Sequence, residues 1–144
     1  MSDMNHNPLI EKYRAANQFG GLLKMEFFIL DPGKVRYTLE VGQEHLATPS
    51  AGHGGVIAAL ADALLGVGAL SLVCSDNNVV ATLDLNVSFL EPFQPGDVLT
   101  GISKPVKVGR RIIFMEGEII NQENKLLARC AGTFNAYPSE KAGY

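Results

Sequence analysis

The stretch that decides the fold is AGHGGVIAALADALLGVGALSLVC, residues 51–74. After His53 it consists almost entirely of Ala, Leu, Gly, Val and Ile, and its only charged side chain is Asp62. An apolar segment of this length predicts a helix, and a helix that is apolar on every side has to be buried. We therefore expect one long central helix with a single carboxylate near its middle.

The segments around this helix have the pattern of β-strands. Residues 35–41, VRYTLEV, alternate strictly and are joined by a Pro-Gly turn to the apolar run 25–30. Residues 79–92, VVATLDLNVSFLEP, also alternate, which predicts one face with Leu83, Leu85, Val87 and Phe89 and an opposite face with Thr82, Asp84, Asn86 and Ser88. Three more strands are expected over residues 97–109, 110–120 and 126–137, with an edge position or a bulge at Pro105.

Short turns between these segments favour antiparallel pairing. A curved antiparallel sheet of five to six strands, wrapped round the long helix, would bury both the helix and the apolar strand faces. We therefore expect an α+β protein of the hot-dog kind, with residues 1–144 in one domain. A short helix is expected over residues 8–17, because Asn7 and Pro8 suit an N-cap and a first helical position.

Composition excludes several classes of function. The net charge is −3 and the basic residues are spread along the chain, which argues against nucleic-acid binding. Cys74 and Cys130 lack CxxC spacing, which is typical of reduced core residues in a cytosolic protein, and no signal-peptide pattern begins the chain, so we expect a cytoplasmic location. Residues 51–74 could span a membrane by length, but a central Asp is costly in lipid. No His, Cys or carboxylate pair has metal-ligand spacing, so we expect no metal and no cofactor.

Asp62 admits a structural and a catalytic interpretation. It could be a buried carboxylate held by backbone N–H groups or a hydroxyl, or it could be a catalytic base or nucleophile. Burial of an unpaired carboxylate costs several kcal/mol, and perturbed carboxylates gather at functional sites. The HGG motif, residues 53–55, places unpaired N–H groups at the helix start, where they can hold a polarised carbonyl. Together these features favour catalysis.

Three motifs resemble those of a known family. HGGVIAALAD (53–62), TLDLNVSFLEPFQPGD (82–97) and GTF (132–134) are similar to the hot-dog acyl-CoA thioesterases of the phenylacetate-degradation type. The resemblance implies hydrolysis of aryl-acyl or medium-chain acyl-CoA thioesters by homodimers or homotetramers.

The resemblance also implies roles for individual residues. Asp62 would be the general base or nucleophile, and the N–H of Gly54 would polarise the thioester carbonyl. Thr82 would place the water, and His53 would support the loop and the substrate end. Two positions depart from the family pattern, because Ala47 stands where some members have Asn, and Ser50 where Gly is frequent.

Other residues are weaker candidates for the site. Gly55 and Asn86 are candidates for substrate binding. Lys107, Arg110 and Arg111 could bind the phosphates of coenzyme A, or could form a solvated hairpin end. His53 could itself be a base, whereas His45 and His6 are expected in solvent. Two further functions remain open: a hot-dog dehydratase that uses His53 with Asp62, and a non-catalytic acyl-CoA binder.

The spacing of the helix residues predicts a shared site. Gly54 and Asp62 are eight residues apart, about 12 Å along a helix axis, so one chain cannot bring both to the same carbonyl. Two helices that run antiparallel across a twofold axis could place Gly54 of one chain beside Asp62 of the other. We therefore expect a homodimer with composite sites, and the family resemblance implies that it could assemble further into a homotetramer.

Overall fold

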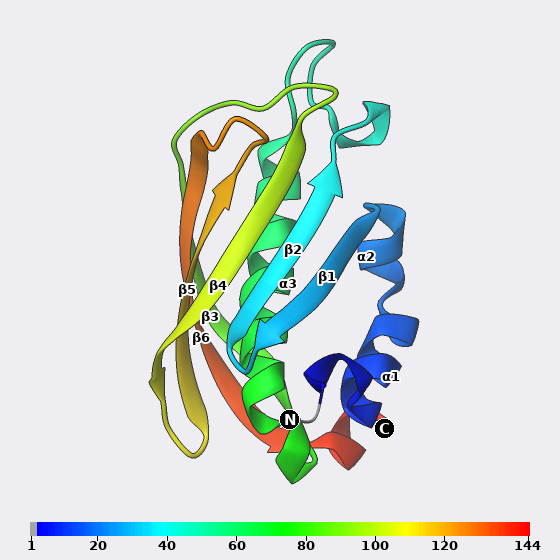
Figure 1. Ribbon diagram of the computed structural model, residues 1–144, viewed down its shortest axis with the longest axis vertical. Helices are drawn as coiled ribbons and strands as arrows, with labels where there is room; N and C mark the ends of the chain where they lie inside the picture. The colour runs from blue at the N-terminus through cyan, green and yellow to red at the C-terminus, as the bar shows by residue number, and fades with distance from the viewer. Residues whose placement is uncertain (1–2) are drawn as a thin grey trace.

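The computed structural model describes residues 3–144, which form one curved antiparallel sheet around one long helix (Figure 1). The strands lie in the order β1-β2-β4-β5-β6-β3. They are β1 (Met25–Asp31), β2 (Lys34–Glu40), β3 (Asn78–Phe89), β4 (Val98–Val108), β5 (Ile112–Ile120) and β6 (Leu126–Pro138), and the helices are α1 (Pro8–Ala16), α2 (Gln18–Leu22) and α3 (Gly54–Val73). Six antiparallel strands around one helix confirm the predicted α+β hot-dog fold. The single domain predicted over residues 1–144 includes residues 1–2, which lie outside the described part.

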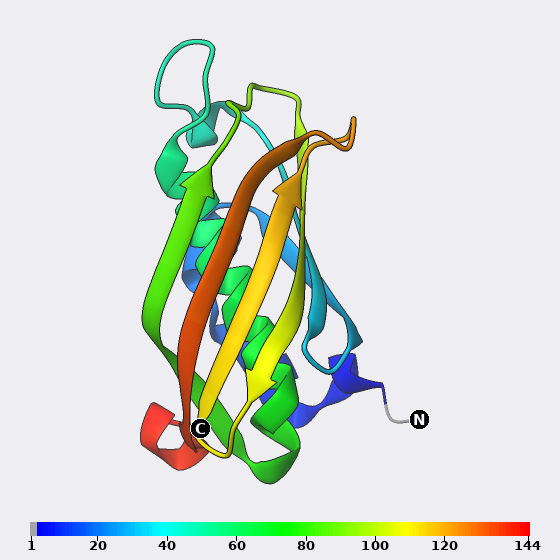
Figure 2. The same cartoon turned by 90° about the vertical axis from the view of Figure 1, so that its left-hand side faces the viewer.

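Helix α3 packs against the concave face of the sheet, and Figure 2 shows the convex face with the helix behind it. Val35, Tyr37 and Leu39 of β2 are buried on the concave face, as their alternation predicts. The helix is long and apolar enough to span a membrane, but here it is the core helix of the sheet. Cys74 and Cys130 are both buried and form no disulfide.

Helix α3 is the buried core helix that was predicted, but one stripe of it is not fully covered. Ala59, Asp62, Ala63 and Gly66 are only half-buried. Residues three and four apart lie on the same side of a helix, so these four form one continuous stripe. The Asp62 carboxylate therefore lies on the part of the helix that its own sheet leaves open, which removes the need for deep burial of a charge.

Strand β3 also departs from the predicted alternation, because a β-bulge lies at Leu83. Thr82 pairs with the buried Phe134, and directly paired residues point to the same face, so Thr82 points toward α3. After the bulge the phase changes, and Asp84 and Asn86 point to the convex face. The prediction that Thr82 shares a face with Asp84 and Asn86 is wrong. The bulge at Val106 of β4, in contrast, lies directly after Pro105, the residue from which an edge position or a bulge was predicted.

The N-terminal helices lie beside edge strand β1, and the C-terminal turn lies near the last turn of α3 (Figure 1). Helix α1 begins where it was expected, with the Asn7 side chain accepting the Leu9 N–H at 2.9 Å. Helix α2 was not predicted, because Gly20 and Gly21 in a five-residue helix conceal it. Short 3-10 helical turns complete the chain: η1 (Met4–His6), η2 (Gln43–His45), η3 (Cys74–Asp76) and η4 (Ser139–Ala142).

Candidate active site

His53 caps the start of α3. Its Nδ1 accepts the N–H of Gly55 at 2.8 Å, which assigns the ring proton of the neutral imidazole to Nε2. A Cβ at Gly55 would lie 2.8 Å from the same Nδ1, so this cap requires glycine. Because its N–H is bonded to His53, Gly55 supports the capping loop rather than offering a free donor to a substrate.

Gly54 is the residue whose N–H points out of the helix end without a protein partner. It is exposed, and no acceptor for its N–H exists among residues 3–144. The ring of Phe89 approaches within 3.4 Å of the position a Cβ would take. A free N–H at the positive end of a 20-residue helix can polarise a carbonyl oxygen, which is the role predicted for it.

Two buried contacts fix the loop that leads to Gly54. His45 is fully buried, its Nδ1 accepts the Gly42 N–H at 2.9 Å, and its carbonyl accepts the His53 N–H at 2.8 Å. Gly52 donates to the Phe93 carbonyl at 2.8 Å, and its Cα faces the Phe93 ring so closely that a Cβ would overlap it. The prediction that His45 is solvated is wrong, because its ring holds this loop; His6 is exposed, as expected.

Asp62 and Thr82 form the polar pair of the site. The Thr82 hydroxyl donates to Asp62 Oδ1 at 2.8 Å, and this bond is possible only because the bulge at Leu83 turns Thr82 inward. No other hydrogen bond to the carboxylate exists within residues 3–144, so Asp62 Oδ2 can accept a proton from water. A carboxylate with one oxygen held by Thr82 and the other oxygen free is suited to act as a general base or a nucleophile.

A cavity of about 300 Å³ lies next to this pair. Its walls come from α1, α3, β3, β6 and the C-terminal turn, and include Leu9, Tyr13, Val80, Phe134, Tyr137 and Tyr144. Burial raises the pKa of the Tyr13 phenol; a hydrogen bond with Tyr37 opposes this, and the charge on Asp62 adds to it. Neither Tyr13 nor the C-terminal residues were among the candidate site residues.

In one chain Asp62 and Gly54 do not line the same hollow. Asp62 and Thr82 face the cavity just described, whereas Gly54 lies in a second hollow with Ile57 and Phe89 near the helix start. The two residues are about 12 Å apart along α3. A single chain therefore presents a carboxylate and an N–H donor at two places.

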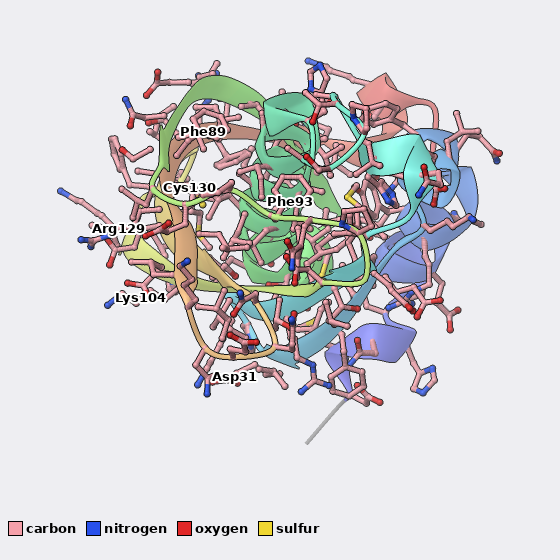
Figure 3. The ribbon with its side chains drawn as sticks, turned by 90° about the horizontal axis from the view of Figure 1, so that it is seen from above. Asp31, Phe89, Phe93, Lys104, Arg129 and Cys130 are labelled. Carbon is pink, nitrogen blue, oxygen red and sulfur yellow. The ribbon has the colours of Figure 1, made fainter. Side chains whose placement is uncertain are left out.

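The remaining predicted residues lie away from both hollows. Asn86 lines a separate depression on the convex face, beside the Lys104–Glu116 ion pair of 3.1 Å. Lys104 and Arg129 lie outside the curve of the sheet, while Phe93 lies at the end where α3 begins (Figure 3).

The predicted phosphate-binding cations occupy the end of the β4–β5 hairpin. Lys107, Arg110 and Arg111 are exposed, and the Arg111 side chain reaches Asn135 Oδ1 at 3.5 Å. Ala47 and Ser50, the departures from the family pattern, are exposed in the loop before His53. Among residues 3–144, no three His, Cys, Asp or Glu side chains are grouped as a metal site.

Comparison with known proteins identifies the family. Residues 52–128, more than half of the chain, match the thioesterase superfamily. The chain belongs to the thioesterase superfamily. The matched segment includes the capped start of α3, Asp62 and Thr82. The predicted enzyme class, a thioester hydrolase, is thereby confirmed.

Individual relatives and solved structures are consistent with this family membership. It is 26% identical over 100 residues to human acyl-coenzyme A thioesterase 13, which covers 68% of this chain and 69% of that protein. The PaaI protein of E. coli, from the phenylacetic acid degradation operon, has the same fold, with a TM-score of 0.84, 21% identity and 94% of each chain covered. A hypothetical thioesterase protein of Streptococcus pneumoniae, solved with coenzyme A, gives a TM-score of 0.72 at 26% identity, with 79% of this chain and 86% of that chain covered.

Proposed function

We propose that the protein hydrolyses acyl-CoA thioesters with a small aryl or medium-chain acyl group, giving the free acid and coenzyme A. The observation that carries the proposal is the 2.8 Å bond between Thr82 and Asp62, which holds a half-buried carboxylate beside a cavity of about 300 Å³. That volume is at the lower end for small-molecule pockets and suits an acyl group alone. The human relative named acyl-coenzyme A thioesterase 13 and the fold shared with PaaI support this choice of substrate.

In the proposed reaction the Gly54 N–H holds the carbonyl oxygen of the thioester. Asp62 takes a proton from a water molecule, the water oxygen bonds to the carbonyl carbon, and the C–S bond breaks. The departing thiolate then takes up a proton, so that acid and free thiol are released. Direct attack by Asp62, with an anhydride that water hydrolyses later, uses the same groups. In both routes Thr82 fixes the orientation of the carboxylate.

A second copy of the chain would complete the site. Strand β3 is an edge of the sheet, and Leu83, Phe89 and Leu90 are exposed along it. Two such edges paired antiparallel, with the twofold axis at Asn86 and the bulge residue Leu83 left unpaired, would place Thr82 opposite Phe89 of the partner subunit, with both side chains on the concave face. Because Phe89 lies against Gly54 and Thr82 holds Asp62, this pairing would bring the Gly54 N–H of one chain level with Asp62 of the other.

The coenzyme A portion of the substrate would stay at the surface. Lys107, Arg110 and Arg111 offer three exposed cations for its phosphates at the end of the β4–β5 hairpin. The Streptococcus pneumoniae thioesterase solved with coenzyme A supports this class of ligand. Assembly of the homodimer into a homotetramer and a cytoplasmic location are part of the same proposal.

A thiol-release assay on a panel of short, medium, long and aryl acyl-CoAs tests the proposed function. We expect release of free thiol, fastest with small aryl or medium-chain substrates. A dehydratase that uses His53 with Asp62 would change the enoyl absorbance without releasing thiol. A non-catalytic binder would bind an acyl-CoA without turnover, and either of those results would refute the proposal.

A further inference from the structure

The cavity beside Asp62 is elongated along α3. Asp62, Gly66 and Leu70 all line it, and they are spaced four residues apart on one side of the helix. The cavity therefore follows the helix for about 12 Å, from the carboxylate to Leu70. We refer to it as the α3 slot.

Gly66 lines the slot from the helix side, one turn beyond Asp62, and has no side chain to fill it. A Cβ at Gly66 would meet only Phe134 Cε1, at 3.7 Å, which is ordinary van der Waals contact. Neither backbone conformation nor close packing therefore demands glycine here. Glycine in the middle of a helix destabilises it by about 0.5–1 kcal/mol relative to alanine. Alanine at position 66 would therefore fit the space and stabilise the helix, yet the chain has glycine there.

Gly68 on the same helix provides a contrast. A Cβ there would lie 2.6 Å from Met115 Cε and 2.9 Å from Ser103 Oγ, so close packing against the sheet explains that glycine. Gly66 has no such explanation within the fold, and its missing side chain corresponds to open space in the slot.

The other walls of the slot are largely aliphatic and aromatic side chains, and segments near both ends of the chain contribute to them. Leu9 and Tyr13 of α1 cover one side, and Tyr144 after the C-terminal turn covers another. Val79 and Phe134 are buried on the sheet side. These walls suit a hydrocarbon or aromatic group that begins at the carbonyl next to Asp62 and extends toward Leu70.

We propose that Gly66 is a specificity-determining residue, which keeps the α3 slot open one helical turn beyond Asp62 so that the acyl group can extend toward Leu70. This inference rests on the proposed thioesterase function. Short acyl groups end before they reach Gly66, whereas medium-chain and aryl groups pass it. A side chain at this position therefore shortens the slot without touching the carboxylate.

The test is the acyl preference of Gly66→Ala and Gly66→Leu, measured as kcat/KM for acetyl-, butyryl-, octanoyl- and phenylacetyl-CoA. We expect Gly66→Leu to lower kcat/KM for octanoyl- and phenylacetyl-CoA at least about tenfold relative to acetyl-CoA. Gly66→Ala fits the available space, so it keeps the experiment decisive if the leucine variant fails to fold; it should shift the preference in the same direction, by about threefold.

Gly68→Ala is the matched control. Its added Cβ crowds Met115 on the sheet side, so it should lower the melting temperature and leave the acyl preference unchanged. An active enzyme whose preference is the same in wild type and both Gly66 variants would overturn the role of Gly66. A wild-type protein that releases thiol from no acyl-CoA would instead overturn the proposed function, so the two failures are distinguishable.

Discussion

The composite site predicts that two inactive variants restore each other. Gly54→Pro removes the N–H donor at the helix start. Proline should fit there, because His53 before it has φ −80° and ψ 129°, the extended conformation that a residue before proline prefers. Asp62→Ala removes the carboxylate. Since Gly54 and Asp62 are about 12 Å apart in one chain, each homodimer lacks one essential group in both of its sites.

The size of the recovery follows from counting. When the two variants are refolded together at equal concentration, random pairing makes about half of the dimers mixed. Each mixed dimer has one site with both groups and one site with neither, so activity should return to about a quarter of the wild-type value. Thiol release measures it, with each variant refolded alone as the control. Mixed dimers that form, as shown by differently tagged chains, but stay inactive would refute the shared site.

Three further predictions concern the binding of the coenzyme A portion, the loop before α3 and the core. Replacement of Lys107 and Arg110 by Glu, which reverses their charge, should raise KM for acyl-CoA but not for an acyl-pantetheine thioester that lacks the nucleotide. Equal effects on both substrates would show that these cations do not bind the nucleotide. Gly52→Ala should destabilise the protein by about 1–3 kcal/mol in urea unfolding, because its Cβ overlaps the buried Phe93 ring, and an unchanged midpoint would contradict that packing. Burial raises the pKa of the Cys130 thiol from 9.0 to about 11, so the folded state keeps a proton that the unfolded state loses. The free energy of unfolding should therefore fall by up to about 3 kcal/mol more in the wild type than in Cys130→Ala as pH rises from 9 to 11. Identical pH profiles of the two proteins would contradict a raised pKa of the Cys130 thiol.

The fold was predictable because its main signals are local. The apolar run after His53, with its central Asp62, favoured a core helix over a membrane span, and the alternation in residues 35–41 correctly identified the concave face of β2. The position of Asp62 on this helix was equally visible. The half-buried stripe around Asp62 could not be predicted. The sheet leaves one side of the helix open, and which side that is depends on where the last strand lies.

The partners of Asp62 could not be derived from periodicity alone. Thr82 reaches the carboxylate through the bulge at Leu83, and a bulge shifts the strand phase without a Gly or Pro to announce it. For the same reason Asn86 was expected beside Thr82 and lies on the convex face instead. The resemblance to a known family named Thr82 as a candidate residue, and the structure places its hydroxyl 2.8 Å from Asp62 Oδ1, whereas the alternation alone assigned it a shared face with Asn86.

The loop and the cavity were also beyond reach of the sequence pattern. His45 looked like a surface histidine in a polar segment, yet its two ring nitrogens bond to Gly42 and Leu23 and fix the approach to Gly54. Tyr13 and Tyr144 come from opposite ends of the chain and meet at one cavity. Contacts of such long range have no signature in a single sequence.

The most direct test of the central claim is the turnover of Asp62→Asn. Asparagine has the same shape and can still accept the Thr82 hydroxyl, so the variant should fold with an unchanged melting temperature. It cannot take a proton from water or act as an anionic nucleophile, so kcat for the best acyl-CoA should fall at least about a hundredfold. A folded variant that keeps more than half of the wild-type kcat would show that Asp62 is structural.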